Sequence, residues 1–174
     1  FIHEAMIWVE SRNHHAVQEV VSRVQPDFVL IDDDCAYKTG TMISPEMMTD
    51  FTLEPSRQTF KLISDLGIPI AFHTDGRLDD VIQLLLELGV SAVHGCEKQA
   101  NDLCHLVSEF GDQITLCGNM DVLFLSAAPP EEVSAETEKI LQIGSSSGQF
   151  IAGCNTSPQD YLPLENYRAM ANAI

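Results

Sequence analysis

Five short apolar segments constrain the fold of this chain more than any other feature of its sequence. Each is nearly continuous in apolar residues and is followed by turn-forming or polar residues. The segments cover residues 27–32, 68–72, 91–95, 113–117 and 149–152. Strands of this kind are typical of parallel sheets, in which helices cover both faces. The sequence therefore predicts a parallel sheet built from these strands.

Segments with the apolar spacing of amphipathic helices separate the strands. We expect helices over residues 1–24, 44–66, 79–88, 101–110, 130–143 and 163–174. Ser44 suits the N-cap of the second helix and Pro45 its first position, whereas Pro55 should kink or divide it. A break near Asn13 is expected in the first helix.

Repeated alternation of strand and helix is typical of a doubly wound sheet or a (β/α)8 barrel. No GxGxxG or GxxxxGK[ST] motif follows a strand, which disfavours a nucleotide-binding sheet. Five strand–helix units are too few to close an eight-stranded barrel. We therefore expect residues 1–174 to form an α/β domain, the C-terminal portion of a (β/α)8 TIM barrel whose early strands are absent from this chain. Such a portion should expose a large apolar edge unless another chain covers it.

The charge and cysteine content exclude several classes of function. A formal net charge of −17 in 174 residues argues against nucleic-acid binding, which needs clustered Lys and Arg. No apolar run has the length of a membrane span, and the N-terminus lacks the layout of a signal peptide. The five cysteines are odd in number and form no CxxC pair, which favours a reducing compartment over a disulfide framework. We expect a cytoplasmic protein that binds neither nucleic acid nor membrane.

Ionisable and thiol side chains gather after the strands, where parallel α/β folds place their functional residues. The residues concerned are Asp32, Asp33, Asp34, Cys35, His73, Asp75, His94, Cys96, Glu97, Cys117, Asn119, Asp121, Cys154 and Asn155. Taken singly, the three consecutive aspartates suit a solvated turn or a helix cap, His73 a structural histidine and Cys154 a small buried hydrophobe. We favour packing roles for His94 and Cys96.

Three of these side chains suit a zinc ion when they are taken together. If the second and fifth strands are neighbours, His73, Asp75 and Cys154 converge at one mouth of the barrel. Zn²⁺ accepts nitrogen, oxygen and sulfur ligands, and a catalytic site leaves its fourth position open. Without a metal, the same aspartate and histidine could serve as acid and base groups for proton transfer to carbon.

Several segments of the chain resemble the uroporphyrinogen decarboxylase superfamily. The resemblance runs through residues 33–45, 73–76, 118–121, 153–154 and 163–166, in the order that the superfamily has them. It implies a (β/α)8 barrel with one of two activities. One is a decarboxylase that uses no metal, and the other is a methyltransferase that depends on a corrinoid (cobalamin) and binds zinc through a His-x-Cys pair and a distant Cys.

The methyltransferase branch matches these positions better. His73 matches the zinc-binding histidine and Cys154 the distant cysteine, whereas Asp75 stands in place of the first cysteine. The resemblance implies a zinc-dependent enzyme that moves a methyl group between a small molecule and a cobalamin carried by a partner corrinoid protein. His73, Asp75 and Cys154 would then be the metal ligands, because they occupy the matching positions.

The resemblance also implies roles for other residues. Asp33, Asp34 and Asp75 would be catalytic or line the substrate pocket, and Asn119 and Asp121 would contact the cofactor. A carboxylate at position 75 makes thiol activation by the metal less favourable and fits O-methyl or N-methyl substrates. The alternatives are a metal-free carboxy-lyase and a non-catalytic barrel that binds a corrinoid protein or a small molecule. A homo-oligomer is compatible with each of them.

Overall fold

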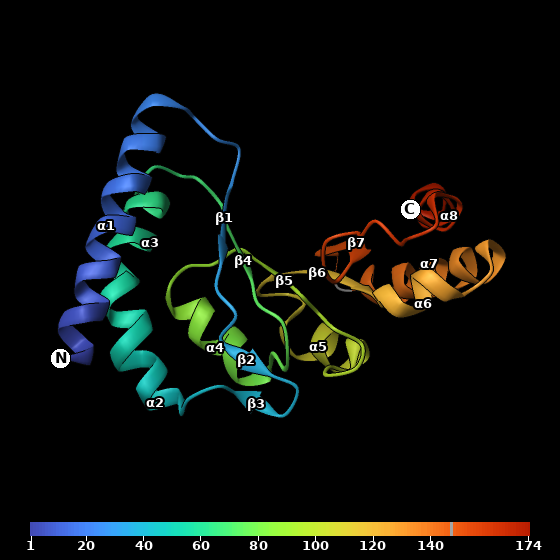
Figure 1. The fold of residues 1–174 in the computed structure, drawn as a ribbon, viewed down its shortest axis with the longest axis horizontal. Coiled ribbons are helices and arrows are strands. Elements are labelled where there is room, and N and C mark those ends of the chain that lie inside the picture. Colours follow the sequence, from blue (N-terminus) through green and yellow to red (C-terminus); the bar gives the residue numbers. More distant parts are fainter. Residues whose placement is uncertain (147) are drawn as a thin grey trace.

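The computed structural model describes residues 1–146 and 148–174, and its centre is a curved parallel sheet (Figure 1). The strands are β1 (Val29–Asp32), β4 (Ile70–His73), β5 (Ala92–His94), β6 (Thr115–Met120) and β7 (Phe150–Cys154). Their order in the sheet is β1-β4-β5-β6-β7, so each crossover moves one strand further in the same direction. Doubly wound sheets reverse direction at a switch point, whereas barrels do not. The predicted partial (β/α)8 barrel is confirmed.

The long helices follow the strands as the apolar spacing predicts. They are α1 (Ile2–Arg23), α3 (Glu54–Asp65), α4 (Asp79–Glu87), α5 (Leu103–Phe110), α7 (Pro130–Gly144) and α8 (Leu164–Ala173). The expected break near Asn13 is wrong, because α1 continues through it. None of the helices among the described residues combines the length and apolar character needed to cross a bilayer.

The expected division of the helical segment 44–66 is confirmed. Ser44 caps α2 (Pro45–Met48) by accepting a hydrogen bond from the Met47 amide. A π-helical turn, η1 (Thr49–Leu53), then joins α2 to α3. Pro55 lies in the first turn of α3, where its missing N–H leaves no hydrogen bond unmade.

Three short elements were not predicted. A hairpin of β2 (Ala36–Tyr37) and β3 (Gly40–Thr41) follows β1, and α6 (Val122–Ala127) follows β6. Two-residue strands and a six-residue helix are too short to show a hydrophobic period. The hairpin matters for the site, because it lies beside the loop that follows β4.

The two faces of the sheet differ in burial. Side chains alternate along a strand, so Ile70, Phe72, Val93 and Leu116 point to the helices and are buried in the core. Their neighbours Ala71, His73, Ala92 and His94 are only half-buried, because no helix of the described chain covers that side. Leu30 on β1 and Ile151 on β7 are 55% and 58% exposed, so the edge strands carry the predicted exposed apolar side chains.

Candidate functional site

The register of the sheet sets one row of side chains across the strands, and this row passes through the carboxyl ends of β1, β4 and β5. Asp32 pairs with His73, His73 with His94, His94 with Cys117, and Cys117 with Ile151. Paired residues on neighbouring parallel strands point to the same face. The row therefore lies on the face opposite the helices, which is the inner face of a barrel.

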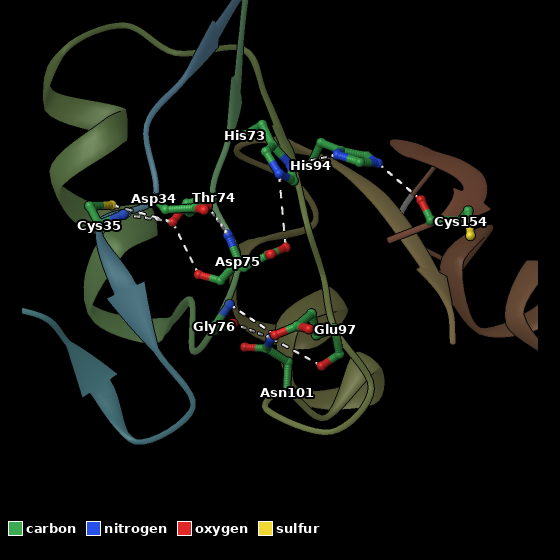
Figure 2. Close-up of polar contacts among 10 residues, drawn as sticks. All are labelled: Asp34, Cys35, His73, Thr74, Asp75, Gly76, His94, Glu97, Asn101 and Cys154. Carbon is green, nitrogen blue, oxygen red and sulfur yellow. Dashed lines mark hydrogen bonds and ion pairs between the residues drawn. The ribbon is translucent and has the colours of Figure 1, made fainter. Parts of the chain in front are cut away.

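Two histidines of this row contact each other. Nδ1 of His73 lies 2.7 Å from Nδ1 of His94, and Nε2 of His94 lies 3.0 Å from the backbone carbonyl oxygen of Cys154 (Figure 2). Burial lowers the pKa of His94, the hydrogen bond to the Cys154 carbonyl opposes this, and the electrostatic effect of the neighbouring His73 lowers it further. The neutral imidazole of His94 is therefore favoured.

Carboxylates lie near His73 as well. Its Nε2 lies 3.9 Å from Oδ1 of Asp75, and Asp34 accepts a hydrogen bond of 3.0 Å from the Asp75 amide (Figure 2). Three side chains here each offer one potential ligand atom, and these atoms lie within 4.8 Å of one another; they belong to Asp32, Asp34 and His73. Oδ1 of Asp75 is buried and has no hydrogen-bond partner in the described part of the chain.

These residues fit a metal ion. The Asp75 side chain is 44% exposed as a whole, but its Oδ1 is shielded and makes no hydrogen bond to the described residues, so a bound cation would give that oxygen a partner. Imidazole and carboxylate are both zinc ligands, and a set rich in oxygen also suits other divalent cations. His73, Asp32 and Asp34 would hold the ion, and Oδ1 of Asp75 lies next to His73.

Cys154 lies apart from this carboxylate–histidine group. The strand order places β5 and β6 between β4 and β7, so the two strands are not neighbours as the expected convergence required. The Cys154 side chain packs against the hydrophobic core, and burial raises the pKa of its thiol. In Figure 2 its sulfur lies away from His94, and only its carbonyl group reaches the row. The role of Cys154 as a metal ligand stays a prediction.

The loop after β4 is held by contacts that the sequence did not indicate. The Thr74 side chain is fully buried and accepts a hydrogen bond of 3.1 Å from the Cys35 amide. The Gly76 amide donates to Glu97 at 3.0 Å, and the Asn101 amide group donates to the Gly76 carbonyl at 2.8 Å (Figure 2). Gly76 has a φ of 90°, and a Cβ there would lie 2.7 Å from the Ala36 backbone.

Such a loop fixes where Asp75 lies relative to His73. Asn101 stands just before a helix and could be taken for a cap residue from the sequence alone. Asp102 is the residue that caps α5, by accepting from the Cys104 amide. Nothing local therefore marks Asn101 as a support of the site.

Both residues expected to contact a cofactor make hydrogen bonds within the chain. Asn119 has a φ of 81° and donates to the Cys96 carbonyl at 2.9 Å. Asp121 caps α6 by accepting from the amides of Leu123 and Phe124. Their cofactor role stays a prediction.

Asp33 borders a cavity of about 480 Å³ between α1, α3 and β1. The carboxylates of Glu10, Asp32 and Asp33 line it, and no basic side chain does so among the described residues. Burial raises the pKa of Asp33, and repulsion by Asp34 and Asp32 adds to this. Asp33 thus borders the cavity and Asp34 belongs to the carboxylate–histidine group, whereas Asp32 contributes to both.

A one-directional parallel sheet with its polar side chains at the carboxyl ends of the strands defines a barrel of the enzyme type. The family model of uroporphyrinogen decarboxylase (URO-D) matches residues 15–174, and the chain belongs to this family of enzymes.

A solved methyltransferase from Methanosarcina mazei has a similar structure. The TM-score is 0.64 at 21% sequence identity, and the match covers 84% of this chain. At this identity the likeness shows a shared fold. The chain spans 41% of that structure's length. Comparison with curated proteins found no relative of this chain.

Proposed function

We propose that this chain forms part of a zinc-dependent methyltransferase, which moves a methyl group between a small molecule and a cobalamin carried by a partner protein. The observation that carries the proposal is the carboxylate–histidine group at the carboxyl edge of the sheet, with an unpartnered oxygen of Asp75 beside it. The family and the methyltransferase fold support an activity of this class.

Each residue of the site has a separate task in this proposal. We assign Nε2 of His73 to the ion, because Nδ1 contacts His94, and Asp32 and Asp34 supply oxygen ligands. Asp34 also accepts the Asp75 amide hydrogen, which holds the loop after β4 against β1. A bound zinc ion supplies Lewis acidity toward the heteroatom that carries or receives the methyl group.

The charge around the site favours a neutral or cationic methyl compound. Asp32 and Asp34 belong to the carboxylate–histidine group, and Asp75 lies beside His73. An anionic substrate at the site would be repelled by these carboxylates. This disfavours the metal-free decarboxylation of a polyanionic porphyrinogen.

Metal analysis of the purified protein tests the proposal. We expect zinc in stoichiometric amount, and we expect His73→Ala to lose it. His15→Ala is the matched control, because His15 is exposed on α1 away from the site. A folded wild-type protein that takes up no zinc would refute the metal part.

Two further variants separate the two ligand sets. Asp34→Asn should lose zinc and Cys154→Ala should retain it if the carboxylate–histidine group holds the ion. The reverse result would favour the set of His73, Asp75 and Cys154. Methyl transfer is then measured with methylcobalamin and small acceptors, by the change in corrinoid absorbance. No change with any thiol, alcohol or amine would contradict the methyltransferase proposal.

A further inference from the structure

His94 is the histidine of the row that the proposed function does not use. It stands on β5 directly beside His73 in the register of the sheet, and both of its ring nitrogens have a partner. We propose that His94 is a positioning residue, which fixes the tautomer and the ring orientation of His73 so that Nε2 of His73 is unprotonated and free to bind a cation.

The Cys154 carbonyl sets the proton on His94. A carbonyl oxygen can only accept, so Nε2 of His94 must carry the hydrogen of their 3.0 Å hydrogen bond. A neutral imidazole has one N–H, so Nδ1 of His94 offers a lone pair. Cys154 thus orients His94 through its backbone carbonyl, independently of any role of its thiol.

The same logic then sets the proton on His73. At 2.7 Å from a lone pair, Nδ1 of His73 must carry the hydrogen and donate it. The neutral ring of His73 then has its lone pair on Nε2, the atom 3.9 Å from Oδ1 of Asp75. Histidines that bind metals commonly donate their other N–H to an outer partner, which fixes the tautomer.

The backbone after β5 allows this close approach. Gly95 has a φ of 106°, and a Cβ there would lie 2.1 Å from the Thr74 carbonyl oxygen and 3.5 Å from Cε1 of His73. A side chain at this position would displace the start of the loop after β4. The glycine therefore lets the His73 ring lie against β5, within reach of His94.

The tautomer is tested by NMR on the wild-type protein with ¹⁵N-labelled histidine and without metal. We expect His73 to be protonated at Nδ1 and His94 at Nε2. A His73 ring protonated at Nε2 would overturn the proposal, whether or not the protein binds zinc. This measurement needs no variant, so a folding defect cannot obscure it.

Zinc affinity tests the consequence, which rests on the proposed function for the identity of the cation. His94→Phe removes the acceptor, and zinc should bind about 10–100-fold more weakly. His94→Asn restores an acceptor near Nδ1 and should recover most of the affinity, and His15→Phe is the control. Unchanged affinity in a folded His94→Phe protein would overturn the proposal. If the wild type binds no zinc but shows the expected tautomers, only the metal part of the proposed function fails.

Discussion

Asn101 supports the loop that carries Asp75, and its replacement by alanine should destabilise the protein strongly. The side chain is 8% exposed and makes three hydrogen bonds to the backbone. Its amide group donates to the carbonyls of Gly76 at 2.8 Å and Glu97 at 3.2 Å, and its oxygen accepts from the Leu78 amide at 2.9 Å. The bonds to Gly76 and Leu78 are buried, so water cannot replace them.

The magnitude follows from the groups that lose their partners. A buried donor or acceptor left unsatisfied costs roughly 1–3 kcal/mol, so Leu78 N–H and the Gly76 carbonyl together cost about 2–6 kcal/mol. The bond to the Glu97 carbonyl is only partly buried and adds little. For a domain of this size each kcal/mol lowers Tm by about 2–4 °C.

Urea unfolding followed by circular dichroism measures the loss in free energy of unfolding. Asn101→Asp keeps the volume and the acceptor for Leu78, but places a carboxylate oxygen against the Gly76 carbonyl, so it should also destabilise. Asn13→Ala is the control, because Asn13 is exposed and should change stability by no more than about 0.5 kcal/mol. A loss below about 1 kcal/mol for Asn101→Ala would refute the reasoning about buried unsatisfied groups.

Two further predictions concern the cysteines and Asp33. Burial raises the pKa of Cys96 to about 12 and that of Cys117 to about 11, so both thiols should resist iodoacetamide at pH 8 until the protein is unfolded. The exposed thiol of Cys104 should react in the folded protein. Mass spectrometry measures the labelling of each cysteine, and fast labelling of Cys96 would contradict the prediction. The pKa of Asp33 is raised in the folded protein, so ionisation of this carboxyl opposes folding. The stability that the neutral carboxyl contributes is fully present below the unfolded pKa near 4, and it is lost as pH rises through the pKa in the folded protein. Asp33→Asn should therefore gain stability over wild type between pH 4 and pH 7 in urea unfolding with a chelator present, and an equal difference at both pH values would contradict it.

The long, strongly periodic elements could be predicted because their signal is local. Each of the five strands and six long helices lies close to its expected segment. The hairpin of β2 and β3 and the short α6 escaped prediction, since elements of two to six residues carry no measurable period. The continuity of α1 through Asn13 was missed because asparagine lowers helix propensity only modestly.

The residues of the candidate site, like the elements of the fold, could be predicted only in part. His73 and Asp34 were expected at the carboxyl ends of strands, and the structure places them in one group. His94 was assigned to packing, yet it is the closest polar partner of His73. Asn101 carried no signal, because its two buried partners are backbone groups of the loop after β4, which lie 23 and 25 residues away in the sequence.

The sequence by itself determined which residues form strands and helices and that the ionisable side chains follow the strands. These properties depend on apolar period and turn chemistry within a few residues. Only the tertiary structure decided which strands are neighbours and in what register, because many weak long-range contacts set both. That order separates Cys154 from His73 by two strands, and that register places His94 beside His73.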